Sequence, residues 1–352
     1  MESPGAAGAF LYPLSILYGA GVRTRLAAYR AGVLKQRKIP CTVISVGNIT
    51  AGGSGKTPMT IFLARFLRER GEKVVVVSRG YKGTSKGVNV VSDGEVIFMG
   101  PKSAGDEPCL MARRLKGVPV VVGPDRVRAG LFSIEKFSPD FIILDDGFQH
   151  IRLMRDLNIL LVDSETGLGN FRLLPSGILR EPAGEIKRAD LIMVKGKGLG
   201  HREAALIKGF GMPVSGFDYR ACGMLDLREK KLLATEGLKG RRAFAFAGIA
   251  RPGAFFKTLK ALGADVAGTA SYPDHHVYRA RDIEEINEEA GGVSAEVIIT
   301  TEKDGVKLEG LLGKSKGPPL YALSVEVVLK DPAGFERLMA PYLKGKPGPR
   351  SL

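Results

Sequence analysis

The sequence predicts an α/β protein built on a doubly wound parallel sheet, with a second, smaller α/β domain joined to it by a β linker. Apolar, β-branched runs recur along the first two thirds of the chain, as buried parallel strands do. Segments with helical spacing lie between these runs, the alternation typical of doubly wound sheets. The 352 residues are 44% hydrophobic and 25% charged, which is enough for about two domains with ordinary cores.

The N-terminal segment, residues 1–38, combines an apolar stretch with a basic cluster. Residues 3–22 carry no charge, and a secretory signal would place its positive charges before such a stretch rather than after it. Prolines and glycines dilute the stretch, which argues against a membrane span. Leu14, Leu17 and Tyr18 share one helical face, so the segment is either an interfacial membrane helix, which we favour, or a helix on the protein's own core. The cluster that follows is Arg23, Arg25, Arg30, Lys35, Arg37 and Lys38.

The main domain is predicted over residues 39–218. Its strands are expected at residues 41–48, 73–78, 118–122, 140–145, 158–163 and 190–195. Helical spacing predicts helices over 58–70, 107–115 and 126–136.

The pattern changes near residue 217, where short strands and turns are expected to form a β linker over residues 219–240. The smaller domain is predicted over residues 241–343. Its strands are expected at 241–250, 264–269, 296–301 and 319–329, with a helix ending near Leu262. The basic tail, residues 344–352, is rich in Pro and Gly and is expected to be frayed.

The net charge is the unusual feature of the composition. Fifty-two Lys and Arg against 37 Asp and Glu leave a formal charge of +15, which indicates an anionic partner: nucleic acid, a membrane surface or a small substrate. The chain has no Trp and no recognisable nucleic-acid module, so nucleic acid is the least favoured of these partners. Three widely spaced cysteines argue against a disulfide framework or a structural zinc site.

Residues 50–57, TAGGSGKT, follow a predicted strand and open a predicted helix, the context of a P-loop. Glycines let backbone amides surround phosphate oxygens, Lys56 supplies a positive charge to the β/γ-phosphates, and the Thr57 hydroxyl can reach Mg²⁺. The motif's first glycine is replaced by Thr50. A glycine-rich turn with a chance lysine is the alternative, but the context favours a nucleotide loop and a P-loop NTPase-like fold. The expected loop residues are Thr50, Ala51, Gly52, Gly53, Ser54, Gly55, Lys56 and Thr57.

An acidic pair ends the predicted strand in FIILDDGFQH, residues 141–150. A carboxylate at the tip of a buried strand can face the Mg²⁺ held by Thr57, as in a Walker B element. Asp145 and Asp146 should point to opposite faces, so either could be the metal ligand. Gln149 and His150 are expected at the mouth of the site. The alternative is a capping turn.

Further blocks accompany these two motifs in order: SRGYKG, GDEP, GNFRLLPSGILREP, YPDHH and TTEKDGVK. Together with SVGNITAGGSGKTP and DDGFQH they make the chain resemble the tetraacyldisaccharide 4′-kinase (lipid A 4′-kinase) family up to about residue 307. The resemblance implies transfer of the γ-phosphate of ATP, with Mg²⁺, to the 4′-hydroxyl of tetraacyldisaccharide 1-phosphate, giving lipid IVA. It also implies a position at the cytoplasmic face of the bacterial inner membrane. The implied partners are the lipid disaccharide and the anionic membrane surface, without nucleic acid or an obligate protein partner.

The resemblance also assigns residues. It implies that Asp106 of GDEP is the catalytic base, assisted by Glu107, although Asp106 alone reads as a helix cap before Pro108. It pairs this aspartate with a histidine of DHH; we favour His275, although the sequence does not separate it from His276, and His201 is expected to be incidental in a loop. Lys56 is expected to take part in catalysis. Functional arginines are implied at Arg79, Arg126 and Arg180, and Glu181 is a candidate for the Mg²⁺ shell.

A switch protein is the alternative function. P-loop GTPases or ATPases of the metallochaperone or partitioning type share the loop and the fold class. The TTEKDGVK block lacks the spacing of a guanine motif, and a switch would give GDEP and DHH no role.

Overall fold

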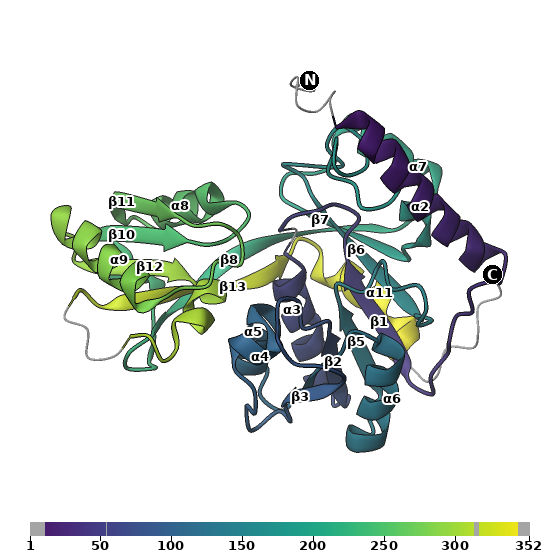
Figure 1. Cartoon of the computed structure of the whole chain (residues 1–352), viewed down its shortest axis with the longest axis horizontal. Coiled ribbons are helices and arrows are strands. Elements are labelled where there is room, and N and C mark those ends of the chain that lie inside the picture. The colour runs from purple at the N-terminus through teal and green to yellow at the C-terminus, as the bar shows by residue number, and fades with distance from the viewer. Residues whose placement is uncertain (1–10, 54, 313–316, 344–352) are drawn as a thin grey trace.

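The computed structural model describes residues 11–53, 55–312 and 317–343. One continuous sheet runs through it in the order β11-β10-β12-β13-β8-β7-β6-β1-β5-β2-β4-β3, with β9 paired to β8. This sheet carries a larger unit, on the right in Figure 1, and a smaller unit on the left. The predicted α/β class is confirmed, and most strand pairs in the sheet are parallel.

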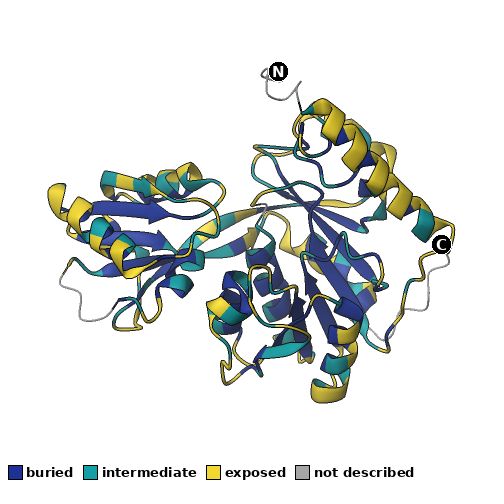
Figure 2. Ribbon diagram, viewed as in Figure 1, coloured by how far each residue is buried: buried dark blue, intermediate teal, exposed yellow. Residues whose placement is uncertain are grey.

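The strands of the larger unit form where the apolar runs predict them, apart from the strand at Asn89–Ser92, which no predicted run covers. They are β1 (Thr42–Gly47), β2 (Val74–Ser78), β3 (Asn89–Ser92), β4 (Val120–Val122), β5 (Phe141–Asp145), β6 (Leu157–Asp163) and β7 (Leu191–Lys195). Nearly all their residues are buried, because helices or long loops cover both faces of the sheet (Figure 2). Since β1, β2 and β4 to β7 are parallel, their carboxyl ends meet at one edge, where ligands bind in open α/β sheets.

The helices bury their apolar stripes against this sheet. On one face α3 (Lys56–Arg68) and α5 (Asp106–Arg114) share a core cluster with β1, β2 and β5; on the other, α6 (Arg126–Phe137) packs on β2 and β5. A third cluster joins β6 and β7 to α7 (His201–Gly209) and η1 (Ala183–Arg188). The short α4 (Pro101–Ala104) precedes α5. His201, expected in a loop, instead begins α7.

The helix α2 (Tyr12–Arg30) packs on the larger unit through its small residues. The N–H of Ser176 donates to the Ser15 hydroxyl at 2.8 Å, and a side chain at Gly19 would collide with Leu173. Leu26 is buried, but the large apolar side chains in the first half of α2 face outward: Leu17 is 70% and Leu14 53% exposed. The ribbon of α2 is accordingly coloured mostly as exposed in Figure 2. Packing on the protein's own core therefore does not account for the apolar face.

None of the helices in the described ranges combines the length and the apolar character that crossing a bilayer requires. Residues 1–10 of the predicted interfacial segment and the tail 344–352 lie outside the described residues.

Two long strands join the units. β8 (Val214–Asp226) is parallel to β7 at its start and antiparallel to β13 (Leu320–Leu329) over most of its length. Figure 1 shows this pair extending from one unit into the other. This corrects the expectation of several short strands in the linker at residues 219–240. The 13-residue β8 extends into that range, and the short β9 (Leu232–Leu233) and η2 (Thr235–Leu238) follow it. Long antiparallel pairing with β13 keeps β8 extended.

The smaller unit repeats the α/β pattern. Parallel pairs link β10 (Arg242–Ala247) to β11 (Asp265–Ser271) and β12 (Val297–Thr301), and β12 to β13. Apolar clusters lie on both faces of these strands, with α8 (Pro252–Ala261) in one and α9 (Ala280–Gly292) in the other. The short α10 (Glu302–Gly305) and η3 (Val306–Leu308) follow β12 directly.

The last described helix returns to the larger unit. In α11 (Pro332–Leu343), Phe335 is fully buried, with its ring centroid 5.7 Å from that of Phe62 and 5.3 Å from that of Phe66 on α3. Residues 332–343 were included in the range expected for the smaller domain, 241–343. Their apolar face instead completes the core around α3.

We predict that Phe335→Ala lowers the free energy of unfolding by about 3–5 kcal/mol, because it leaves a cavity between α11 and α3. Urea-induced unfolding followed by circular dichroism measures the loss. The control is Phe98→Ala, at a phenylalanine 58% exposed, which should change the value by less than about 0.5 kcal/mol. Equal effects of the two substitutions would contradict this packing.

Candidate active site

The phosphate loop leaves the carboxyl end of β1 and opens α3, as predicted. Gly52 and Gly55 have φ of 101° and 76°, the left-handed region that glycine adopts without strain. Thr50, at the position of the motif's first glycine, is not in that region, so threonine is tolerated there. The Asn48 amide donates to the Thr50 carbonyl at 2.7 Å, which holds the start of the loop. Ser54 lies outside the described residues.

Tyr219 of β8 holds the end of the loop. Its hydroxyl donates to the Gly55 carbonyl at 2.8 Å, and a Cβ at Gly55 would lie only 1.5 Å from that hydroxyl. A side chain is therefore excluded at Gly55 by both its dihedral angle and its neighbour. The strand that joins the two units thus also supports the phosphate loop.

Lys56 faces the acidic end of β5. Its ammonium lies 3.3 Å from the Asn48 side-chain oxygen and 3.7 Å from the Asp146 carboxylate. Asp146 has a φ of 50° and also pairs with Arg180 at 3.0 Å. Burial would raise the pKa of Asp146, but Lys56 and Arg180 outweigh it and lower that pKa.

Asp145 lies deeper, on the side of α3. One carboxylate oxygen accepts from the Thr60 hydroxyl and the other from the Ser78 hydroxyl, both at 3.2 Å. Burial, with Glu107 and Asp146 nearby, raises the pKa of Asp145 to about 7.

The two aspartates and the Thr57 hydroxyl suit a Mg²⁺ ion that nucleotide phosphates also bind. Mg²⁺ in such sites takes one or two carboxylates and completes its shell with phosphate and water. A cation would favour the ionised form of Asp145, which burial disfavours. A fully protein-built cage is not required, and the described residues contain no group of three or more His, Cys, Asp or Glu that could form one.

Glu181 does not fit its expected place in the Mg²⁺ shell. One of its carboxylate oxygens pairs with Arg25 of α2 at 2.7 Å and the other with Arg188 of η1. The side chain is fully buried, and burial raises its pKa despite both arginines. Two arginines therefore occupy the oxygens a metal would need, and Glu181 ties α2 to the larger unit.

Asp106 and His275 come from different units and meet. Asp106 begins α5 and is buried; Nδ1 of His275 lies 2.9 Å from one of its carboxylate oxygens and 3.2 Å from the other. Burial would raise the pKa of Asp106, but the hydrogen bond from His275 and the charge of Lys303 outweigh it and lower that pKa. The carboxylate is thus ionised and oriented at neutral pH, as a general base must be.

The structure separates the two histidines that the sequence left open. His276 does not contact Asp106; its Nε2 lies 3.1 Å from the Asp282 carboxylate in the first turn of α9, and its ring packs against Tyr272 and Tyr278. Of the two histidines, His275 therefore makes the expected contact with Asp106, and His276 does not. The backbone turns at His275, whose φ is 62°, so successive side chains point to different neighbours.

The remaining predicted residues line the same edge of the sheet. Gln149 donates to the Asn48 carbonyl at 2.8 Å, and Arg180 approaches its side-chain oxygen at 3.4 Å. Arg126 is buried with its Nε unpaired among the described residues, whereas Arg79 is exposed. Burial and the charge of Arg126 lower the pKa of His150 to about 4, so His150 is neutral at pH 7.

Three site residues were missed from the sequence. Asn48 lies in the block SVGNITAGGSGKTP, between the strand and the P-loop. A polar side chain at that junction is a sequence signal for a residue that holds the loop. Lys303 lies in TTEKDGVK, a block in which the sequence predicts no site residue. Its ammonium nevertheless lies 3.2 Å from the Glu107 carboxylate and 3.9 Å from the Asp106 carboxylate. Tyr219 carried no signal, because only the fold brings β8 to the loop.

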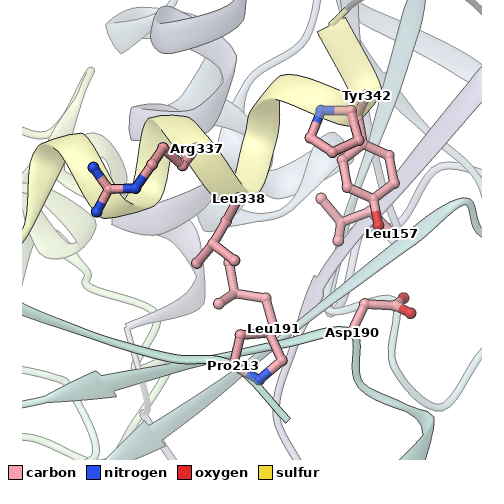
Figure 3. Close-up of a pocket in the computed structure, with 8 residues that line it drawn as sticks. Leu157, Asp190, Leu191, Pro213, Arg337, Leu338 and Tyr342 are labelled. Atoms are coloured by element: carbon pink, nitrogen blue, oxygen red, sulfur yellow. The ribbon is translucent and has the colours of Figure 1, made fainter.

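A cavity of about 320 Å³ lies away from this site. Figure 3 shows it between α11 and the starts of β6 and β7, lined by Leu157, Leu191, Leu338 and Tyr342 among others. These are the amino ends of parallel strands whose carboxyl ends carry the site. The cavity therefore lies at the opposite edge of the sheet.

We predict that Tyr219→Phe weakens nucleotide binding about two- to tenfold, because one part-buried hydrogen bond to the phosphate loop contributes roughly 0.5–1.5 kcal/mol. Isothermal titration with Mg·ATP measures the change. Tyr321→Phe is the control, since this buried β13 tyrosine makes no side-chain hydrogen bond within the described residues, whereas Tyr219 is half-buried. Unchanged affinity in Tyr219→Phe would show that the loop does not need this support.

Comparisons with known proteins agree on one family. A family model described as Tetraacyldisaccharide-1-P 4′-kinase matches residues 7–344. The chain is 44% identical over 330 residues to the tetraacyldisaccharide 4′-kinase of Geobacter metallireducens, covering 93% of this chain and 96% of that protein. It is 41% identical over 345 residues to that of Syntrophus aciditrophicus, covering 94% and 91%. The crystal structure of "apo" form LpxK from Aquifex aeolicus in complex with ATP superposes with a TM-score of 0.78 at 38% identity, covering 96% of this chain and 99% of that one. The chain therefore belongs to the tetraacyldisaccharide-1-P 4′-kinase family.

Proposed function

We propose that this protein transfers the γ-phosphate of ATP to the 4′-hydroxyl of tetraacyldisaccharide 1-phosphate, which yields lipid IVA and ADP. The observation that carries the proposal is the buried, ionised Asp106, oriented by His275 across the boundary between the units. A phosphate loop alone suits many nucleotide-binding proteins. A carboxylate held ready for a hydroxyl proton suits a kinase.

The reaction is an in-line exchange of bonds. Asp106 accepts the proton of the acceptor hydroxyl as its oxygen bonds to the γ-phosphorus, and the bond to the bridging oxygen of ADP breaks. The proton then passes from the carboxyl to solvent.

The remaining residues position groups and balance charge. The loop amides and Lys56 bind the phosphates, while Arg180, Arg126 and Arg79 supply guanidinium groups for phosphate oxygens. Thr57, Asp145 and Asp146 would hold Mg²⁺, which neutralises phosphate charge when bound.

The switch-protein alternative is disfavoured by the same contact. A P-loop GTPase or ATPase of the metallochaperone or partitioning type has no use for an ionised aspartate held by a histidine of a second unit. The match of the kinase family model to residues 7–344 also favours a kinase over a switch protein.

The protein is also proposed to bind the cytoplasmic face of the inner membrane through α2. Its outward face presents Tyr12, Leu14, Ile16, Leu17 and Tyr18, all exposed. Cationic residues follow along the same segment, and Lys35 and Lys38 are exposed. Apolar side chains beside basic ones favour an anionic lipid surface, where the acylated substrate resides.

Asp106→Asn is expected to lower kcat by about 10²- to 10⁴-fold, because the amide cannot accept the hydroxyl proton. Formation of 4′-phosphorylated product from Mg·ATP and a tetraacyldisaccharide 1-phosphate measures it. The affinity for ATP should change less than twofold (about 0.4 kcal/mol) because Asp106 lies outside the phosphate loop.

Asp265→Asn, at an exposed aspartate of β11, serves as the control and should retain full activity. Wild-type protein that forms no product would rule out the proposed function. Full activity in Asp106→Asn would rule out the base.

Leu14→Ser combined with Leu17→Ser should weaken binding to phosphatidylglycerol vesicles at least tenfold, since each exposed leucine contributes about 1.5–3 kcal/mol when fully buried. Sedimentation with vesicles measures this, and wild-type binding should fall as salt rises. The matched substitution Leu232→Ser, at a leucine 63% exposed on the smaller unit, should leave binding unchanged. Retention of the double variant would show that α2 is not the contact surface.

A further inference from the structure

The segment of residues 178–181 is joined to the start of the phosphate loop by its backbone. The Ala51 N–H donates to the Ile178 carbonyl at 2.7 Å, and the Arg180 N–H donates to the Ile49 carbonyl at 2.8 Å. The two stretches of chain run antiparallel at this point. Any displacement of the segment therefore also acts on the beginning of the loop.

The side chain of Arg180 extends from this segment to the acidic end of β5. Its guanidinium pairs with the Asp146 carboxylate at 3.0 Å and approaches the side-chain oxygen of Gln149 at 3.4 Å. Asp146 also faces the Lys56 ammonium of the loop at 3.7 Å. The backbone position of the segment therefore decides where the Arg180 guanidinium lies relative to the phosphate loop.

The helix α2 contacts the same segment directly. The Tyr18 hydroxyl donates to the Arg180 carbonyl at 2.8 Å, and the Arg25 guanidinium pairs with the fully buried Glu181 carboxylate at 2.7 Å. Arg25 also donates to the Gln149 carbonyl at 3.4 Å. Burial and the charge of Glu181 raise the pKa of Tyr18, so its hydroxyl keeps its proton and remains a donor.

Other residues attach α2 to the larger unit. Its buried positions are Ser15, Gly19 and Leu26. Near its end, Arg30 pairs with Glu185 of η1. Substitution of Tyr18 or Arg25 therefore removes the contact with the segment 178–181 while these attachments remain.

We propose that Tyr18 and Arg25 are positioning residues through which α2 holds Arg180 at the phosphate site. This inference rests on the proposed kinase function, in which Arg180 binds phosphate oxygens, and it adds what fixes the position of that arginine. The same helix exposes Leu14 and Leu17, which we propose to contact the membrane. One element therefore serves both the lipid surface and the nucleotide site.

Hydrogen exchange followed by mass spectrometry tests the contact without relying on activity. Tyr18→Phe and Arg25→Met should speed exchange about two- to tenfold in peptides that contain residues 49–51 and 178–181, because a typical hydrogen bond stabilises the closed state by that factor. Peptides from β12 should exchange at the wild-type rate, which shows that the rest of the fold is intact. Wild-type exchange in the first two regions would overturn the proposal.

Arg281→Met is the control variant for both tests. It removes one arginine and a 2.7 Å ion pair with Glu285 on α9 of the smaller unit. Exchange in the two regions and product formation should both stay at the wild-type level in this variant.

The second test is product formation in micelles of a neutral detergent, where the loss of a positive charge cannot act through attraction to anionic lipid. Tyr18→Phe and Arg25→Met should each lower kcat/KM about two- to tenfold. Arg25→Lys should restore part of the rate, because it keeps the charge but lacks the planar fork that reaches two acceptors.

A double-mutant cycle decides whether Arg25 acts through Arg180. In an Arg180→Met background, Arg25→Met should change kcat/KM less than twofold, because the guanidinium that it positions is gone. An equal loss in both backgrounds would refute the proposal, since a merely structural effect of Arg25 persists whatever residue occupies position 180.

The outcomes separate this proposal from the kinase reaction. If both single variants keep the wild-type rate and exchange, the positioning role is refuted and the kinase function stands. If the wild type forms no product, the proposed function fails, and the exchange experiment still decides whether α2 holds the segment. Should Arg180→Met be inactive or Arg25→Met not fold, exchange in the conservative Tyr18→Phe variant decides the question.

Discussion

The hydrogen-bonded pair of β8 and β13 is the constraint on which the active site depends. Asp106 belongs to the larger unit, while His275 and Lys303 belong to the smaller one, and these two strands connect the units within one sheet. The same β8 sends Tyr219 to the phosphate loop. The relative position of the units therefore decides both whether Asp106 is oriented by His275 and whether the phosphate loop is supported by Tyr219. Neither the larger nor the smaller unit carries the whole candidate site. The backbone hydrogen bonds between β8 and β13 hold the two parts of the site together.

Electrostatics organise this site more than apolar packing does. Lys56 and Arg180 meet Asp146 on one side, and Lys303 meets Glu107 and Asp274 on the other. These charges are paired, as the cost of desolvating an isolated ion requires, whereas the buried Arg126 has no carboxylate partner among the described ion pairs.

Local patterns predicted most strands and the loop, because continuous β-branched runs and the GKT signature are determined within a few residues. The boundaries that failed depend on distant partners. The long β8 exists because β13 pairs with it, and α11 packs on α3 rather than on its sequence neighbours. Sequence could place Asp106 and the DHH block in the site only by resemblance, and it could not choose between the histidines. That choice comes from the left-handed turn at His275 and the fixed position of Asp282. The surroundings of Glu181 could not be predicted for a similar reason, since Arg25 reaches it from 156 residues away.

The return of α11 to the first core makes the smaller unit an insertion within the larger one. Phe335 and Met339 fill a core begun by β1 and α3, so the ribosome must synthesise the whole smaller unit before that core can close. Domains generally fold as units, the N-terminal one first, during synthesis. Here the nascent larger unit has an open apolar face on α3 until the last strand and helix emerge. The newly made chain therefore exposes this face during translation, and holdase chaperones act on surfaces of that kind.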